Sequence, residues 1–201
     1  MSDPVVRRAG PADEDAVAAL LHESAADMYN RFAGGRERAL RVLRRAFREP
    51  GTNAGADVIW VAELDGRVAG VAAAFPVDEA VDRGGAFLRL TLRSIPPWRW
   101  PGTLWLYWAG GRAAPSPPGE SLYIDALATI PELRRRGAAS ALLDAIEQLA
   151  RKRGLPAVAL DTSLDNKPAR ALYARAGFEE VAYRPPGRGL PGFVALVKPL
   201  S

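Results

Sequence analysis

The sequence predicts an α/β fold from two observations. Short apolar segments of strand length alternate along the chain with longer segments whose apolar residues recur at helical spacing. The composition, with 48% hydrophobic and 25% charged residues, is that of an ordinary globular domain and not of a disordered chain. Because 201 residues suffice for one sizeable core, we expect a single domain over residues 1–201.

The first part of the chain is predicted to form a strand, two helices and a β-hairpin. The strand covers residues 5–8, and a helix follows from about residue 11, with acidic residues suited to its N-terminus. A second helix is expected after the break at Gly34-Gly35 and ends before Pro50. Strands at 58–62 and 68–72 flank Asp65-Gly66, which is a strong hairpin signal.

An insertion of roughly residues 78–118 interrupts this regularity. It contains many of the prolines and four of the five tryptophans, which are Trp98, Trp100, Trp105 and Trp108. We expect it to have helical pieces of its own and to precede the central strand of the sheet.

The remaining elements form two consecutive strand–helix units and two final strands. Strands are predicted at 122–129 and 157–161, followed by helices at 137–153 and about 168–176, and the last strands at 178–183 and 193–198. Strict alternation along the strand at 122–129 would place Tyr123, Asp125 and Leu127 on one face. Ile124, Ala126 and Ala128 would then share the other face.

Scarce residue types exclude several kinds of site. The chain has no cysteine, which excludes disulfides, thiol nucleophiles and cysteine-ligated metals, and His22 is its one histidine. We therefore expect no metal site.

Charged residues occupy the N-terminus where a signal peptide would need an apolar run, and the uncharged stretch at 101–111 is too short to span a bilayer. We expect a cytoplasmic protein with no membrane partner.

The turn between residues 131 and 136 indicates an anion site. Arg134, Arg135 and Arg136 precede Gly137, where a helix begins, so unpaired backbone N–H groups and positive charge converge. Gly137 and Ala139 would let a pyrophosphate approach the backbone. The segment matches neither a Walker A loop nor a dinucleotide fingerprint, and a plain basic turn remains an alternative.

Together with the segment at 166–178, this turn resembles the GNAT superfamily of N-acetyltransferases. The family signature Gln/Arg-x-x-Gly-x-Gly/Ala is matched by Arg134, Gly137 and Ala139. The downstream pattern Asn-x-x-Ala-x-x-Leu-Tyr-x-x-x-Gly-Phe is matched at Asn166, Ala169, Leu172, Tyr173, Gly177 and Phe178. Residues 121–184 carry the resemblance. It implies a mixed, mostly antiparallel and splayed sheet flanked by helices.

The resemblance also implies an activity and its residues. The expected enzyme transfers an acetyl group from acetyl-CoA, its co-substrate, to a primary amine of a small molecule or peptide by direct attack in a ternary complex. Tyr173 is implied as proton donor and Asp125 as candidate general base, with Glu120 in reserve; a packed core tyrosine and a structural aspartate are the alternatives. The residues implied near acetyl-CoA are Leu127, Ala128, Thr129, Arg134, Arg135, Arg136, Gly137, Ala138, Ala139, Ser140 and Asn166. Asn166 could equally be a helix cap.

The role of the insertion and of the basic charge stays open in the sequence. Trp105 and Trp108 are candidates for binding the acceptor amine, whereas a core extension or a dimer surface would explain the tryptophans as well. A catalytically idle acyl-CoA sensor is one alternative function. The net charge of +4 allows a nucleic-acid-binding protein as another, but the aromatic residues are not interleaved with the basic turn. We expect no nucleic-acid partner, a monomer or homodimer, and an acyl donor that could be longer than acetyl.

Overall fold

The chain forms an α/β structure around one mixed seven-stranded sheet, as the sequence predicts. The computed structural model describes residues 3–187 and 189–200. The strands lie in the order β1-β2-β3-β4-β5-β7-β6, and all neighbours are antiparallel except β4 and β5. The strands are β1 (Val5–Arg8), β2 (Ile59–Leu64), β3 (Arg67–Pro76), β4 (Ser121–Thr129), β5 (Ala157–Ser163), β6 (Glu179–Arg184) and β7 (Phe193–Pro199).

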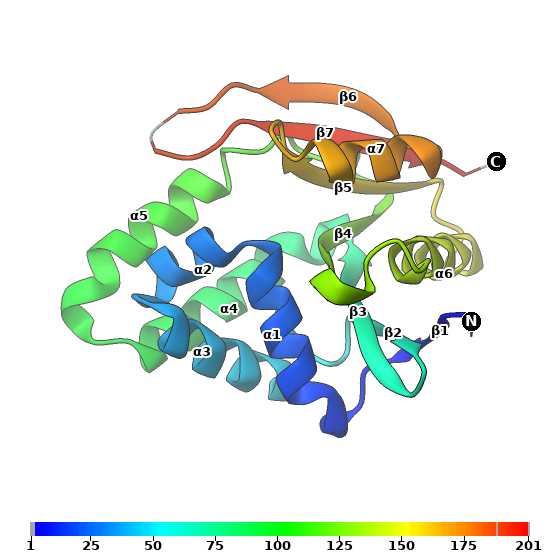
Figure 1. The fold of residues 1–201 in the computed structure, drawn as a ribbon. Coiled ribbons are helices and arrows are strands. Elements are labelled where there is room, and N and C mark those ends of the chain that lie inside the picture. The colour runs from blue at the N-terminus through cyan, green and yellow to red at the C-terminus, as the bar shows by residue number, and fades with distance from the viewer. Residues whose placement is uncertain (1–2, 188, 201) are drawn as a thin grey trace.

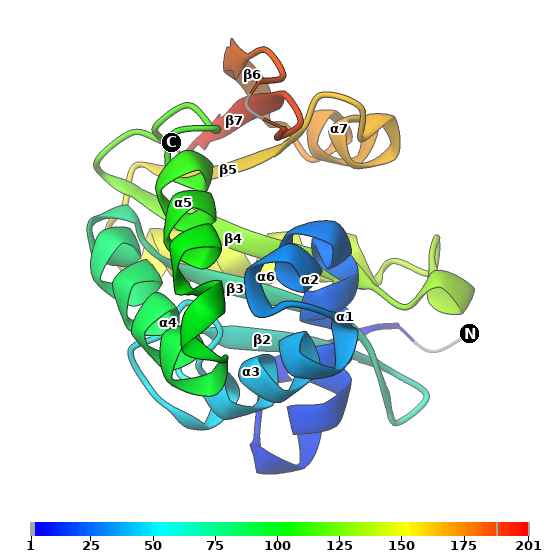
Figure 2. The ribbon, with the colours of Figure 1, turned by 90° about the vertical axis from the view of Figure 1, so that its left-hand side faces the viewer.

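Helices cover both faces of the sheet (Figure 1). One buried cluster joins α1 to α5 to one face of β2, β3 and β4, and a second joins α6 and α7 to the opposite face. Figure 2 shows the first group of helices in front of the sheet. The helices are α1 (Glu14–Ser24), α2 (Ala26–Ala33), α3 (Arg36–Arg48), α4 (Ala80–Ser94), α5 (Trp100–Gly110), α6 (Ala138–Lys152) and α7 (Lys167–Arg175). Single 3-10 turns are η1 (Pro11–Asp13), η2 (Val77–Glu79), η3 (Pro97–Arg99) and η4 (Pro131–Leu133).

The structure adds one helix that the sequence analysis did not predict. α1 ends where Ala25 leaves the helical region, with φ −151° and ψ 51°, and α2 starts at the next residue. The apolar residues of α2, Met28, Tyr29, Phe32 and Ala33, recur at a spacing of four and face the core. That spacing was available in the sequence, but its short length hid it.

The predicted hairpin and insertion are both present. Asp65 and Gly66 have φ of 52° and 74°, as a two-residue turn between β2 and β3 requires. The insertion forms α4 and α5, which bury Phe87, Leu90 and Leu106 against the helical side of the core. All four tryptophans on this segment are exposed.

The sheet divides between β4 and β5, and this feature positions the site. The two strands pair only over four residues, and their last pair is Ile124 with Leu160. Beyond it, β4 continues along β3 to Thr129, whereas β5 continues along β7 to Ser163. The upper and lower parts of the sheet in Figure 1 diverge from this point, which we call the fork.

Candidate active site

A β-bulge places Asp125 on β4 at the fork. Ala73 pairs with Ala126 and the next residue of β3, Ala74, pairs with Ile124, so Asp125 has no partner on β3. The extra residue of a bulge reverses the alternation of the residues that follow it. It also directs the bulged side chain away from the ladder.

This bulge makes the predicted faces of β4 wrong beyond Asp125. Ala126 and Ala128 pack with the α1–α5 cluster, on the side of the sheet that Tyr123 occupies. Leu127 packs with the α6–α7 cluster, as Ile124 does. Tyr123 and Asp125 therefore do not share a face with Leu127, because strict alternation assumes an unbroken ladder.

Asp125 has a polar partner from a distant loop. Asn53, between α3 and β2, donates a hydrogen bond from Nδ2 to Asp125 Oδ2 at 3.1 Å. The carboxylate is exposed to solvent, yet the protein around it removes part of its hydration. That desolvation, together with the charge of Asp161, raises the pKa of Asp125 to about 7, and the Asn53 hydrogen bond opposes the rise. A carboxylate of this kind can accept a proton near neutral pH.

A second carboxylate lies at the corresponding position on β5. Asp161 is the first residue after the last β4–β5 pair, as Asp125 is on β4. Its Oδ1 accepts a hydrogen bond from the hydroxyl of Tyr123. Burial raises the pKa of Asp161, whereas the hydrogen bond from Tyr123 lowers it. Two carboxylates and a tyrosine thus meet where the strands part.

Tyr173 reaches this group from α7. Tyr173 is 6% exposed, and its ring contacts Phe178 edge-on, with the ring centroids 5.9 Å apart. Ala169, Leu172 and Ala176 pack against the same cluster, so this face of α7 points towards the sheet. Burial and the charge of Asp161 raise the pKa of Tyr173 to about 12, so its hydroxyl stays protonated at neutral pH.

Tyr29 of α2 completes the set of tyrosines. Burial and then the charge of Asp125 raise the pKa of Tyr29 above its usual value. Burial, Asp161 and Asp125 do the same for Tyr123. The hydroxyl groups of Tyr29, Tyr123 and Tyr173 are therefore neutral hydrogen-bonding groups around the two carboxylates. We refer to these five residues and Asn53 as the fork cluster.

The turn before α6 has the backbone geometry of an anion site. Arg135 and Gly137 both have positive φ, 63° and 85°. Ala141 donates its N–H to the Gly137 carbonyl, so the N–H groups of Ala138, Ala139 and Ser140 lack an intrahelical partner. Gly137, Ala139 and Ser140 are at least partly exposed, and Ala138 is buried. No side chain caps this helix end, which leaves its N–H groups available to a ligand.

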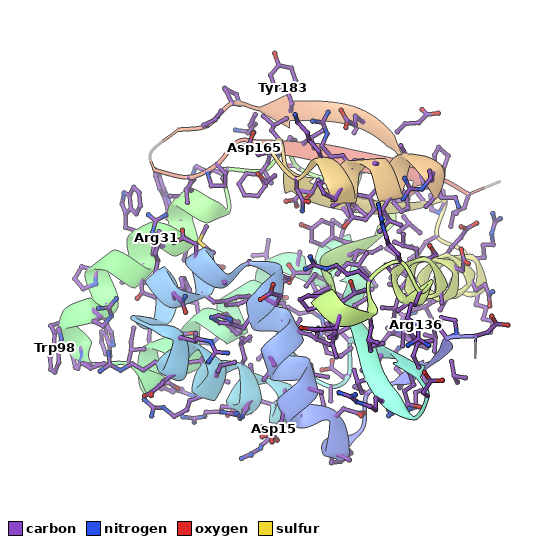
Figure 3. The ribbon with its side chains drawn as sticks, viewed as in Figure 1. Asp15, Arg31, Trp98, Arg136, Asp165 and Tyr183 are labelled. Carbon is purple, nitrogen blue, oxygen red and sulfur yellow. The ribbon has the colours of Figure 1, made fainter. Side chains whose placement is uncertain are left out.

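Two of the three arginines in this turn have carboxylate partners. Arg136 Nη2 lies 2.9 Å from Oδ2 of Asp65 in the β2–β3 turn. Figure 3 shows Arg136 beside the start of α6. Arg134 lies 3.9 Å from Glu23 at the end of α1. Arg135 is exposed. Surface pairs of this kind are weak, so they do not prevent the arginines from turning towards an anion.

The remaining predicted cofactor residues divide into two groups. Leu127, Ala128 and Thr129 lie on β4 beyond the fork, where β4 pairs with β3 on one side and not with β5 on the other. Asn166 is the N-cap of α7: its Oδ1 accepts from the Ala169 N–H at 3.3 Å, and its Nδ2 donates to the Thr162 hydroxyl. The helix-cap alternative for Asn166 is therefore what the structure shows.

The tryptophans and the reserve base lie apart from the fork cluster. Trp108 lines a hollow of about 440 Å³ between α5 and the β6–β7 loop, together with Arg112, Arg184 and Leu190, but Trp105 does not line it. Glu120 precedes β4 and lines another hollow, of about 330 Å³, with Arg153. Trp105, Trp108 and Glu120 are not among the groups that act on the Asp125 carboxylate.

The sequence analysis did not identify Tyr29, Asn53, Asp161 or the role of Tyr123. Asn53 and Tyr29 belong to segments far from the motifs, and only folding brings them to Asp125. Asp161 carried a usable signal, because it follows an apolar strand run that is parallel to β4.

Within the described residues no group of three or more histidine, aspartate or glutamate side chains could hold a metal ion. None of the described helices is long and apolar enough to span a membrane.

Comparison with known proteins identifies the family. The model of the acetyltransferase (GNAT) family matches residues 20–178. Aminoglycoside N(6')-acetyltransferase type 1 from Klebsiella aerogenes is 38% identical over 64 residues, which are 32% of this chain and 42% of that protein. The chain thus spans less than half of that relative's length.

Solved structures share the fold over nearly the full chain. An N-acetyltransferase from Staphylococcus aureus Mu50 has a TM-score of 0.75 at 20% identity and covers 96% of this chain and 99% of its own. The ribosomal-protein-S18-alanine N-acetyltransferase from Escherichia coli has a TM-score of 0.57 at 15% identity, with 98% and 94% covered. The family match, the forked sheet and the exposed helix start agree, and the chain belongs to the acetyltransferase (GNAT) family.

Proposed function

We propose that this acetyltransferase moves an acetyl group from acetyl-CoA to the amine of a small molecule or peptide. The observation that carries the proposal is the placement of Asp125 at the fork, with a pKa of about 7, next to Asp161, whose charge also acts on the protonated hydroxyl of Tyr173 on α7. Acetyl-CoA, when bound, supplies the acetyl group as an activated thioester.

The residues present fit this co-substrate. The backbone N–H groups at the start of α6 suit a pyrophosphate, and the two positive φ angles before it shape the turn around such an anion. The edge of β4 at Leu127–Thr129, which β5 leaves unpaired, suits the amide groups of an extended arm. Arg134, Arg135 and Arg136 would add positive charge near the phosphates.

The chain's own groups supply the proton transfers. Asp125 accepts a proton from the acceptor amine, which must be neutral to attack a carbonyl carbon. Tyr173 keeps its proton at neutral pH and donates it to the leaving group. Asn53 orients the Asp125 carboxylate through its hydrogen bond to Oδ2. Asp125 acts as general base and Tyr173 as general acid in this proposal.

The acceptor is an amine of a small molecule or a peptide. The curated relative is named for aminoglycosides, which carry several amino groups, and the two carboxylates of the fork cluster favour a cationic acceptor. The solvent exposure of Asp125 is consistent with an acceptor that approaches from outside the sheet. An amine panel of aminoglycosides, polyamines and peptides would distinguish among these classes.

Calorimetry with acetyl-CoA tests the first step of the proposal. Wild type should bind saturably, and Gly137→Glu should abolish binding because a carboxylate would occupy the anion site. Gly154→Glu is the matched control: Gly154 also has positive φ, at 68°, and lies at the opposite end of the same helix. This control should bind like wild type. Failure of wild type to bind acetyl-CoA would refute the proposal, and binding without transfer to any amine would instead favour an acyl-CoA sensor.

A further inference from the structure

Asp161 lies beside the proposed base, Asp125, but has no role in the reaction proposed above. It lies on β5 one residue past the last pair with β4, directly across the fork from Asp125. Its carboxylate is fixed by the Tyr123 hydroxyl, and Tyr123 lies on β4 two residues before Asp125. A side-chain hydrogen bond therefore links the two strands at the point where they diverge.

Asp161 acts on both of the residues that are proposed to move protons. Its charge is the main electrostatic influence on Asp125 and on Tyr173, after the effect of desolvation in each case. Asp125 is not among the groups that act on Tyr173, so Asp161 is the group common to both. A like charge beside Asp125 makes Asp125 hold a proton more strongly, and a charge beside Tyr173 disfavours its phenolate.

Resting on the proposed function, we propose that Asp161 is a positioning residue of the transfer reaction. Held by Tyr123, it strengthens Asp125 as a base and disfavours the phenolate form of Tyr173. It does so as a neighbouring charge, without touching the acceptor amine. Tyr123 contributes by donating the hydrogen bond that favours ionised Asp161 over neutral Asp161.

The other groups around Asp125 do not supply this effect. Asn53, from the loop before β2, donates a hydrogen bond that acts in the opposite direction. Tyr29, from α2, is neutral. Arg83 of α4 is engaged by Glu79 and Asp57. No lysine or arginine of the described residues is among the groups that act on the Asp125 or Asp161 carboxylates.

Carbon-13 NMR of the aspartate carboxyl groups tests the inference without relying on activity. In the ligand-free 201-residue chain, the Asp125 signal is assigned by its loss in Asp125→Asn, and its titration midpoint is then measured. Asp161→Asn removes the charge at nearly constant volume and should lower this midpoint by roughly one pH unit. Tyr123→Phe should lower it by less, because Asp161 then becomes protonated more readily. Asp144→Asn, which removes a carboxylate from the exposed side of α6, should leave it unchanged.

The same variants connect the inference to the reaction. If Asp161 acts as proposed, the acidic limb of the kcat/KM profile of Asp161→Asn moves to lower pH together with the NMR midpoint. An unchanged Asp125 midpoint in a folded Asp161→Asn variant would overturn the inference, even if activity fell, because a structural role alone would then explain the loss. If Asp161→Asn does not fold, an unchanged Asp125 midpoint in Tyr123→Phe would overturn the inference instead. Absence of acetyl transfer in wild type would reject the proposed function separately from the NMR result.

Discussion

Two regions of this protein are rich in aromatic residues, and they differ in their surroundings. At the fork, Tyr123 and Tyr173 are enclosed and lie beside the carboxylates of Asp125 and Asp161. Along α5 and the turn before it, large aromatic side chains lie at the surface. Trp98 is 80% exposed and projects from the outer tip of the molecule (Figure 3).

The difference shows why abundance of aromatic residues is a poor guide to chemistry. The segment 83–119, which includes α5 and its exposed rings, contains no aspartate or glutamate. At the fork, burial next to charge shifts the pKa values of the polar side chains, which is how proteins prepare groups for proton transfer. Reactivity depends on the neighbours of a side chain more than on its type.

Among substitutions in the two regions, replacement of Asp125 should cause the largest loss of activity. Asp125→Asn removes the proposed base and should reduce kcat/KM by about 1,000-fold. Asp82→Asn, an exposed residue of α4, is the control with the same chemical change and should keep full activity. Steady-state kinetics with an acceptor from the amine panel measures both. Equal activity of Asp125→Asn and wild type would remove the proposed base.

Replacement of Tyr173 should cause the second-largest loss of activity. Tyr173→Phe removes the proposed proton donor and keeps the ring that packs against Phe178, so the fold should persist while kcat falls about 100-fold. Tyr183→Phe makes the same change at a residue that is 72% exposed, where no loss is expected. A matching loss in both variants would show that the hydroxyl of Tyr173 has no special role.

The raised pKa of Asp125 also predicts a cost in stability. Because the folded protein holds this proton up to about pH 7, whereas an unfolded chain loses it near the ordinary aspartate value, folding stability decreases as pH rises between the two. Asp125→Asn should therefore raise Tm at pH 8, and the difference from wild type should shrink as pH falls towards 5. Thermal unfolding at both pH values measures it, and a lower Tm at pH 8 would contradict the prediction.

The smallest effect is expected on the outer face of α5. Trp98→Ala should change the free energy of unfolding by less than about 0.5 kcal/mol, because the side chain is largely in water in the folded protein. Urea unfolding of this variant measures the change. A loss several times larger would mean that this surface is covered in solution, as a dimer interface would be.

Much of the fold could be predicted because its signals are local. The hairpin at Asp65-Gly66, the amphipathic period of α6 and the sequence of strands around it all depend on neighbouring residues. The start of α6 at Gly137 and the packed face of α7 around Tyr173 were predictable for the same reason. α2 was missed because a helix of eight residues gives a weak periodic signal.

The sequence by itself therefore determined the α/β class and the family motifs, and it offered the turn before α6, Asp125 and Tyr173 as candidates for the site. Only the tertiary structure decided which face each residue of β4 occupies, because a bulge depends on how β3 pairs with β4. It also brought Asn53, Tyr29 and Asp161 to Asp125 from three separate segments. The pKa of a carboxylate depends on the burial and charge around it, and these exist only once distant parts of the chain have packed together.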